Sequence, residues 1–580
     1  MRHGWTAIGT AYLLAFSVQA QDTSLEARYA HLQALNNQAY SLIDAQPRDP
    51  RKLAQAAELL RQSLTAEEQL RPTFRDNAFY EAAGESRHND ATLMLARAYA
   101  LQGDKEQALS TLEALTKESF VGSYRADEIA KDEAFADLRH EPRYQAVMAS
   151  YRRLDTLWNA PAIATSSTEL DEAQRVAGLS LFWSEARYNF VHFDHVPDLD
   201  WNQAYLDFLP KVMAAKNLHD YYDVMMQFAP LLHDGHTNIY PPKSIQNEFY
   251  ARPPVRTAWI DGRVLVTAVR SPALASEVKV GDEVRTIDGQ DVRAYAREHV
   301  APYASSSTPQ DADVRAYDYQ LLQGDHRKPV TLGLQGASGP VRQVTLSREK
   351  DPQTQRAPSF EWRMLPGGVA YLALNEFEDE DGVKAFERAL PEILKAKGLI
   401  LDVRQNGGGS DLMAANILSY LTDQPIPGAQ TRSPEYVPVF RANSGPYMSW
   451  MTLSPGSFEK ERKQHYRGPV VLLIGPRTYS AAEDFVAAFD SIKRGTLVGE
   501  ATGGSTGAPL EFNLPGGGSA RVCAKHDAAP DGREFVGKGM APAIVVAPTV
   551  ADIRAGRDPV LERAVALLTG KLPAASPAAP

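Results

Sequence analysis

The chain of 580 residues has a single cysteine, Cys523, and so cannot form a disulfide bond within itself. It also has no run of basic residues, and its formal net charge of -11 argues against a nucleic-acid partner. Apart from the amino-terminal stretch, no apolar run is long enough to cross a bilayer. These absences leave a globular protein whose 44% hydrophobic content can fill several cores, and its length favours more than one domain.

The first residues have the pattern of a signal peptide. Arg2 and His3 precede an apolar stretch at 5–18, and residues 18–20 resemble a small-residue cleavage site. No cysteine follows that could carry a lipid. We therefore expect residues 1–20 to be removed and the mature protein to be exported in soluble form, to the periplasm or out of the cell.

A serine lies where an apolar run gives way to a helical pattern. Residues 469–475 read PVVLLIG, which is typical of a strand buried on both faces of a parallel sheet, and the helical pattern SAAEDFVAAFDSI starts at Ser480. The dipole and unpaired amides at a helix amino terminus stabilise negative charge, which suits a nucleophile. The same residues fit a capping box, in which Ser480 and Glu483 bond backbone amides and do no chemistry. Both interpretations stay open on this segment alone.

Three consecutive glycines, Gly407, Gly408 and Gly409, form a second motif. They lie between another buried-strand pattern, KGLILDV at 397–403, and a helical pattern that begins at Asp411. Glycines leave backbone amides free to face an anion. A phosphate loop would also need the lysine and hydroxyl of a Walker motif, and these do not follow the glycines. The segment therefore suits an oxyanion, or it is simply a tight strand-to-helix turn.

Histidines supply a third motif. His236 lies in FAPLLHDGHTNIY, where polar DGHT interrupts apolar flanks, so we expect it at the edge of a core. A lone histidine of this kind is more often structural than a base. Two H-x-x-H pairs, His192 with His195 and His233 with His236, have a spacing that also suits zinc. Because HExxH and a third carboxylate ligand at a recognisable spacing are missing, the sequence predicts no metal site and no cofactor.

Taken together, the motifs resemble those of a known family. LLHDGHT, LDVRQNGGG, TYSAAEDF and VGEATGG follow one another in the order found in serine peptidases of the carboxy-terminal processing, or tail-specific, type. The resemblance covers about residues 160–568 and is stronger to the serine and histidine branch that includes the tricorn protease core. Another branch carries a lysine shortly after the VGE motif. No lysine lies between Lys493 and Lys525 here, which argues against a serine and lysine dyad.

The resemblance implies a role for each motif. Ser480 is the nucleophile, His236 is the general base, and the amide of Ala481 with that of Gly407 or Gly408 forms the oxyanion hole. Acyl transfer needs these parts, because a hydroxyl must lose its proton to a nearby acceptor and the tetrahedral oxyanion needs donors already in place. Activity should then fall as the imidazole protonates below about pH 6.5.

The residue that orients the base is where this chain departs from the family pattern. In the histidine branch a glutamate precedes a Gly-x-x-Pro-Asp segment, and here EFVGKGMAPAI places Val536 at the glutamate position and Ala543 at the aspartate position. Glu534 would reach the base if the strand were shifted, although a slip of one residue turns a side chain to the other face. Asp531 is a second candidate. We assign Glu534, and the departure also allows a slow or inactive member.

The remaining patterns predict a multidomain α/β protein. Residues 90–117 show two amphipathic runs joined at 102–104, as in a tetratricopeptide-like hairpin. SEVKVGDEVRTIDGQDV at 276–292 resembles the centre of a PDZ domain, a module that binds extended peptide ends. Alternating strands and helices then predict an α/β core, for which the resemblance implies a crotonase-like fold. The expected parts are the signal peptide at 1–20, a tetratricopeptide-like helical domain at 21–158, a helical cap carrying the base at 159–250, a PDZ-like domain at 251–350, the protease core at 351–570 and a disordered tail at 571–580.

The sequence thus predicts an exported serine endopeptidase that cleaves protein or peptide substrates through an acyl-enzyme at Ser480, without metal or cofactor. The amino-terminal helical domain would recruit a protein partner or substrate. A second interpretation is a non-catalytic periplasmic scaffold that binds peptides in a degenerate active site, and a third is an esterase. Specific labelling of Ser480 by an active-serine phosphonate separates the enzymes from the scaffold.

Overall fold

A computed structural model describes residues 25–74, 78–118, 126–349, 358–453, 456–460 and 462–570. The chain divides into two compact units, Met1–Pro161 and Ala162–Pro580. The expected signal peptide and the expected tail at 571–580 lie outside the described residues. Within the described ranges, no helix combines the length and apolar character that a membrane span requires.

The first unit is helical, as its alanine-rich sequence predicts. The expected hairpin at 90–117 is present, since one helix ends at Gln102, the next begins at Lys105, and Gly103 between them has a positive φ of 79°. Buried side chains such as Leu112 and Phe135 form a core between the later helices. The likeness to a tetratricopeptide domain stays a prediction. The helices are α2 (Leu25–Asp44), α3 (Pro50–Phe74), α4 (Ala78–Gln102), α5 (Lys105–Glu118), α6 (Ala126–Lys131) and α7 (Pro142–Asn159).

A six-stranded sheet forms the centre of the second unit. Its order is β20-β16-β15-β10-β9-β8, and every neighbouring pair is parallel except β8 with β9. All five residues of β10 and all five of β15 are buried, which confirms the two buried strands predicted from their apolar runs. The strands are β8 (Phe360–Leu365), β9 (Val369–Leu374), β10 (Gly398–Asp402), β15 (Val470–Ile474), β16 (Thr496–Gly499) and β20 (Ile544–Val545).

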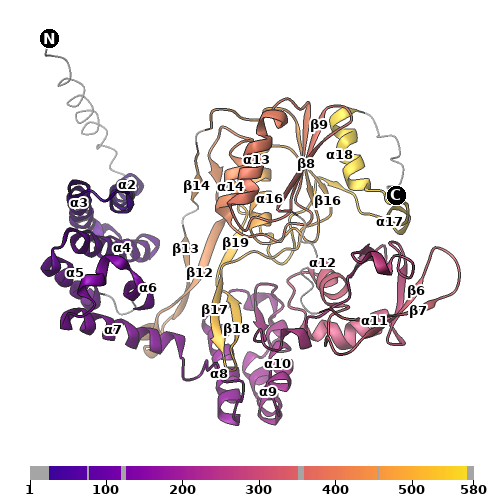
Figure 1. The fold of residues 1–580 in the computed structure, drawn as a ribbon, viewed down its shortest axis with the longest axis horizontal. Coiled ribbons are helices and arrows are strands. Elements are labelled where there is room, and N and C mark those ends of the chain that lie inside the picture. The colour runs from indigo at the N-terminus through magenta and orange to yellow at the C-terminus, as the bar shows by residue number, and fades with distance from the viewer. Residues whose placement is uncertain are drawn as a thin grey trace. The chain divides into compact units, whose positions relative to one another are not determined.

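Helices cover both faces of this sheet (Figure 1). On one face, α13 (Glu380–Ile393), α14 (Asp411–Leu418) and α16 (Ala481–Ser491) enclose the largest core of the protein with the alternate side chains of the strands. On the other face, α18 (Pro559–Thr569) packs Val560 and Ala564 against the sheet. The result is the layered α/β arrangement that the alternating pattern predicts.

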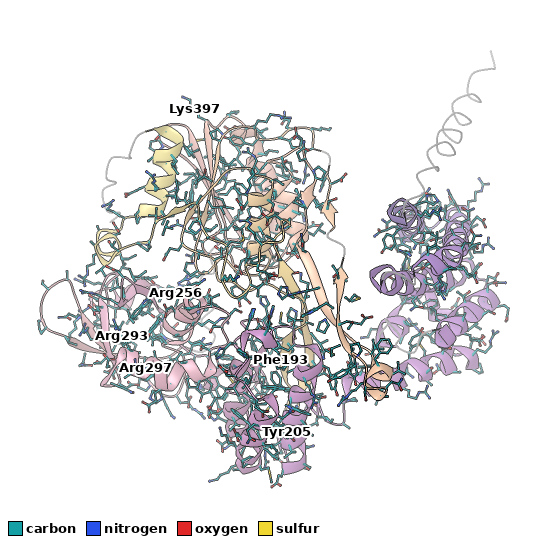
Figure 2. All side chains as sticks on the ribbon, turned by 180° about the vertical axis from the view of Figure 1, so that it is seen from behind. Phe193, Tyr205, Arg256, Arg293, Arg297 and Lys397 are labelled. Atoms are coloured by element: carbon teal, nitrogen blue, oxygen red, sulfur yellow. The ribbon has the colours of Figure 1, made fainter. Side chains whose placement is uncertain are left out.

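The helical cap is completed by a hairpin from far along the chain. Its helices α8 (Glu172–Asn189), α9 (Trp201–Ala214) and α10 (Leu218–Met226) share a core with the hairpin of β17 (Pro509–Leu514) and β18 (Gly518–Cys523). The short strand β1 (Asn238–Tyr240) follows the cap and pairs antiparallel with β18. Figure 2 shows Phe193 and Tyr205 in the cap, far from Lys397 at the other end of the core. This shared core joins the segment around residue 236 to the carboxy-terminal part of the chain.

A smaller β-rich region lies between the cap and the core in sequence. A sheet in the order β2-β3-β4-β6-β7, with neighbours antiparallel, encloses its own core of aliphatic side chains. Figure 2 labels Arg256, Arg293 and Arg297 on this region. Its likeness to a PDZ domain stays a prediction. The strands are β2 (Val255–Ile260), β3 (Arg263–Val269), β4 (Glu283–Ile287), β6 (Val330–Gln335) and β7 (Arg342–Leu346), with the short β5 (Gln290–Asp291) paired to β4.

Candidate active site

Ser480 lies in a strained turn between β15 and α16. Its backbone has φ 55° and ψ -132°, a conformation rare for a residue with a side chain and common where a nucleophile is held at a strand-to-helix turn. The hydroxyl makes no capping bond to the helix, and the backbone amide donates to the carbonyl of Ser505 at 3.0 Å. The capping-box interpretation is therefore wrong, and the hydroxyl is free for another contact.

That contact is with His236, 244 residues earlier in the chain. The Nε2 atom of His236 lies 3.1 Å from Ser480 Oγ, and Nδ1 lies 2.8 Å from the Oγ of Ser505. The imidazole is buried and stacks on the ring of Tyr479, with centroids 5.1 Å apart and planes 14° apart. These contacts fix the ring so that Nε2 faces the serine, which is the geometry of a nucleophile and its base.

Burial favours the neutral form of this imidazole. The pKa of His236 is lowered to about 3, mainly because burial desolvates the ring; the Asp234 carboxylate opposes this shift, whereas the positive charges of Arg521, Arg315 and Lys525 add to it. A neutral imidazole with the proton on Nδ1 donates to Ser505 and leaves the Nε2 lone pair for the Ser480 proton. The ring is thus neutral near neutral pH, and its Nε2 atom faces the Ser480 hydroxyl.

Behind the imidazole, Ser505 is held by Glu483, one turn along α16 from Ser480. The Glu483 carboxylate accepts bonds from the amides of Ser505 at 2.7 Å and Gly504 at 2.8 Å, and from the hydroxyl of Thr502. Burial raises the pKa of Glu483 to about 8, while these three donors favour the charged form. Glu483 therefore positions the segment that carries the hydroxyl facing His236.

Neither carboxylate proposed to orient the base reaches it. Glu534 Oε2 lies 3.4 Å from Nε2 of His526, and 45% of the Glu534 side chain is exposed. Asp531 pairs with Arg533 at 2.8 Å on the surface. The physical reason is local, because Phe535 and Val536, the residues that follow Glu534, turn inward to the main core and leave its carboxylate outside.

Ser505 was not singled out from the sequence, and Glu483 was considered only as one member of a possible capping box. Ser505 lies within GGSTG, whose missing lysine argued only against a serine and lysine dyad. The available signal was the spacing of Glu483, since a carboxylate three residues after a helix-terminal serine points along the same helical face. Nothing in the linear sequence indicates that the GGSTG segment folds back onto that face.

The glycine loop lies against Ser480, and its amides divide into two kinds. Gly408 donates its N–H to Asn406 Oδ1 at 2.8 Å, whereas the N–H groups of Gly407 and Ala481 make no hydrogen bond within the described parts of the chain. A Cβ on Gly408, whose φ is 106°, would lie 2.7 Å from Ser480 Cβ and 3.0 Å from the Ala481 nitrogen. Gly407 and Ala481 thus keep free donors, and Gly408 allows the loop to approach.

The two H-x-x-H pairs are not arranged as the two ligands of a helical zinc motif would be. Both ring nitrogens of His236 contact serine hydroxyls, so this ring has no lone pair left to share with His233. His192 and His195 stack face to face, with centroids 4.8 Å apart and planes 17° apart. This stacking differs from the arrangement in a helical zinc motif, although the ligand atoms of His192, Asp194 and His195 lie within 4.8 Å of one another.

Comparison with known proteins agrees with the predicted resemblance. Residues 368–546 match the family model "Peptidase family S41". The "C-terminal processing peptidase, chloroplastic" of Tetradesmus obliquus is 26% identical over 300 residues, which is 50% of this chain and 57% of that protein. "Putative tricorn protease homolog 2" of Streptomyces coelicolor is 29% identical over 258 residues, covering 42% of this chain and 20% of its own length.

Among solved structures, the one described as "Structure of mature CPAF complexed with lactacystin" superimposes with a TM-score of 0.55 at 16% identity. It covers 69% of this chain and 98% of the other. That likeness shows a shared fold. The matched part of this chain spans about half the length of the curated relatives, 57% and 51% in two chloroplastic processing peptidases. The predicted resemblance to carboxy-terminal processing peptidases is confirmed.

Proposed function

We propose that this chain, whose residues 368–546 match the model of peptidase family S41, is a serine endopeptidase. It would cleave protein or peptide substrates through an acyl-enzyme at Ser480. The observation that carries this proposal is the contact of 3.1 Å between His236 Nε2 and Ser480 Oγ, made by residues 244 apart in sequence. A buried histidine whose free lone pair faces a strained helix-terminal serine has little structural purpose and is what acyl transfer requires.

The first half-reaction follows from this geometry. Ser480 Oγ attacks the carbonyl carbon of the scissile bond while its proton passes to His236 Nε2. The carbonyl oxygen takes the negative charge, and the free amides of Ala481 and Gly407 are its donors. As the tetrahedral intermediate collapses, the imidazolium gives its proton to the leaving amine and the acyl group stays on Ser480. Water then attacks the ester with His236 again as base.

The bond from Nδ1 to Ser505 assigns a positioning role to that hydroxyl. When Nε2 gains a proton, the positive imidazolium donates its Nδ1 proton to Ser505 Oγ at 2.8 Å. Glu483 acts one step further away, because its carboxylate holds the backbone amide of Ser505 and makes no hydrogen bond to the imidazole or the Ser480 hydroxyl within the described residues. In this proposal Ser505 and Glu483 take the place assigned to Glu534 from the sequence.

The close contact between Ser480 and His236 favours this enzyme over the alternative of a peptide-binding scaffold. A scaffold would need neither the strained backbone at Ser480, which costs on the order of 1–3 kcal/mol, nor amides left unpaired beside it. We keep export, with removal of residues 1–20, as part of the proposal. No metal or cofactor has a role in the steps described.

The test uses an active-serine phosphonate together with an unfolded, fluorescently labelled protein substrate. The wild-type protein should be labelled at Ser480 and should cleave the substrate. Ser480→Ala should abolish labelling and lower turnover on the order of 10⁶-fold, and His236→Ala should come close to this. Unchanged cleavage in either variant, with the fold checked by circular dichroism, would overturn the assignment. Labelling without peptide cleavage but with ester hydrolysis would identify an esterase.

A further inference from the structure

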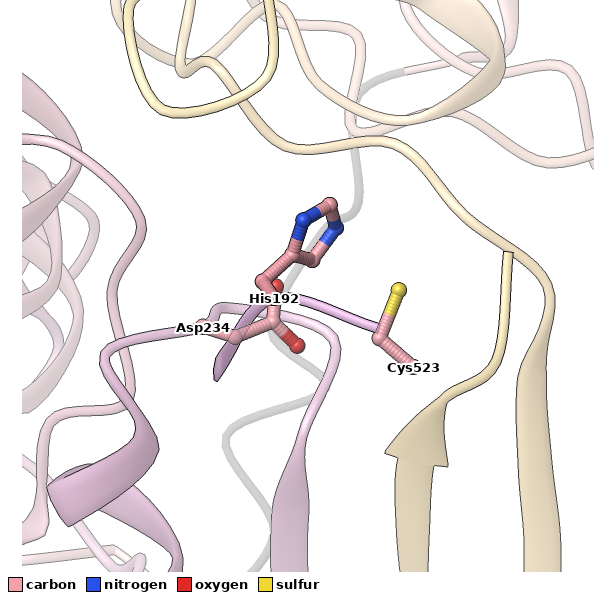
Figure 3. Close-up of side chains that lie close together, drawn as sticks. All are labelled: His192, Asp234 and Cys523. Carbon is pink, nitrogen blue, oxygen red and sulfur yellow. The ribbon is translucent and has the colours of Figure 1, made fainter. Parts of the chain in front are cut away.

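A buried group of three potential metal ligands lies apart from the residues that perform the proposed chemistry. His192, Asp234 and Cys523 come from three separate segments, and their ligand atoms all lie within 4.8 Å of one another. Figure 3 shows the three side chains converging, with the imidazole of His192 beside the Asp234 carboxylate and the Cys523 sulfur. All three are at most 1% exposed.

His192 is the feature of this group that most needs an explanation. Both of its ring nitrogens are buried and have no hydrogen-bond partner within the described parts of the chain. A buried polar group without a partner costs about 1–3 kcal/mol, and a neutral imidazole has both a donor and an acceptor to satisfy. Its ring is held by stacking on His195 and by an edge contact with Phe190 at 6.0 Å. The ring is therefore positioned and unpaired.

The other two ligands are held in place by one hydroxyl. Thr237 Oγ1 donates to Asp234 Oδ2 at 2.6 Å and accepts from the backbone amide of Cys523 at 3.1 Å. The Oγ of Ser307 donates to the second oxygen of Asp234 at 3.3 Å. Hydrogen bonds of this kind to a carboxylate leave lone pairs free and are typical of the groups that orient metal ligands.

We propose that His192, Asp234 and Cys523 form a binding site for a zinc-class divalent ion. The donors are one nitrogen, one oxygen and one sulfur, a set that suits zinc and similar ions and not magnesium or calcium, which prefer oxygen alone. Thiolate and carboxylate together carry two negative charges, so a divalent ion makes the buried site neutral overall. The Cys523 thiol releases its proton to solvent when it binds, and a fourth tetrahedral position stays open.

The ion would tie together three segments that meet only through tertiary packing. His192 follows α8, Cys523 ends β18, and Asp234 lies two residues before His236. Zinc lies about 2.0–2.3 Å from nitrogen and sulfur ligands, so the three atoms must draw together slightly when it binds. Occupancy should therefore raise the thermal stability of the second unit. None of the three side chains contacts Ser480, but the Asp234 carboxylate raises the pKa of His236, so an ion bound to Asp234 would also act on the base.

The experiment is a zinc titration of the full chain after treatment with a chelator, using a chromophoric chelator as competitor. The wild-type protein should bind one ion per chain at this site and gain thermal stability. Cys523→Ser and His192→Ala should each weaken zinc binding by at least about 10–100-fold. That is the loss seen when a residue that only hydrogen-bonds to a metal ligand is removed. His195→Ala is the matched control, because it removes the stacked ring and leaves the three ligands.

A measurement without any variant guards against misfolding of the mutants. Cobalt in place of zinc should give the near-ultraviolet charge-transfer absorption of a cobalt–thiolate bond, which only Cys523 can supply in this chain. Cobalt binding without that band would overturn the proposal, as would zinc affinity that Cys523→Ser leaves unchanged. Loss of binding in both His192→Ala and His195→Ala, with unchanged affinity in Cys523→Ser, would instead assign the ion to His192, Asp194 and His195 and equally overturn the proposal.

Discussion

Replacing Ser505 by alanine tests the least expected part of the site. The substitution removes only the hydroxyl that faces His236 Nδ1 at 2.8 Å. The backbone of residue 505 can still accept from the Ser480 amide and donate to Glu483, so the turn that carries the nucleophile should persist. The change therefore separates orientation of the base from integrity of the fold.

The magnitude follows from the burial of His236, which is 4% exposed. Without Ser505 Oγ, the Nδ1 proton loses its acceptor, and the loss is greatest once the ring is an imidazolium. A hydrogen bond to a charged group contributes about 1.5–3 kcal/mol. Since about 1.4 kcal/mol corresponds to a tenfold change in rate, kcat should fall about 10- to 150-fold. KM should change little, because the hydroxyl lies behind the base.

The assay is the rate of phosphonate labelling at Ser480 together with kcat and KM for a cleaved peptide. Ser491→Ala is the matched control, because Ser491 ends the helix that follows the nucleophile and its buried hydroxyl has no partner in the described structure. The control should behave as wild type. A Ser505→Ala protein whose kcat equals that of the control would refute the proposed orientation of His236.

Four further predictions concern the same site. On chelator-treated protein, the acid limb of kcat/KM should lie well below pH 6.5, because burial lowers the pKa of His236 to about 3; a midpoint near about 6.5 would contradict this. The free energy of unfolding should also fall as pH falls from about 6.5 towards 3, because the unfolded chain takes up a proton on His236 before the folded chain does. Denaturant titrations at several pH values can follow this loss of stability. Glu483→Gln should cost about 1–3 kcal/mol of stability and lower kcat, because an amide NH₂ would then face a backbone N–H. Glu534→Gln should leave labelling unchanged. Equal effects of the two substitutions would count against the role given to Glu483. Gly408→Ala should abolish labelling, since its Cβ would lie 2.7 Å from Ser480 Cβ at a φ of 106°, and normal labelling of a folded variant would show that the loop does not pack as described.

Local chemistry accounts for what the sequence predicted well. The two buried strands were visible because a strand covered on both faces is apolar at every position, as β10 and β15 are. The helix after Ser480 and the turn at Gly408 were visible for a similar reason, since helix formers and glycines act through their own backbone. His236 could be singled out because a polar segment interrupts an apolar one.

The tertiary structure decided which groups meet. Ser505 faces His236 across 269 residues, and Cys523 lies beside Asp234 because β18 packs into the helical cap. No local pattern encodes such contacts, since they depend on how separate elements pack. Packing also turned Phe535 and Val536 inward and left the Glu534 carboxylate outside. The hydroxyl behind the base belongs to Ser505, whose backbone is held by Glu483. The periodicity of the sequence determines which residues are buried. Which partner a buried polar group finds depends on how distant segments pack against one another.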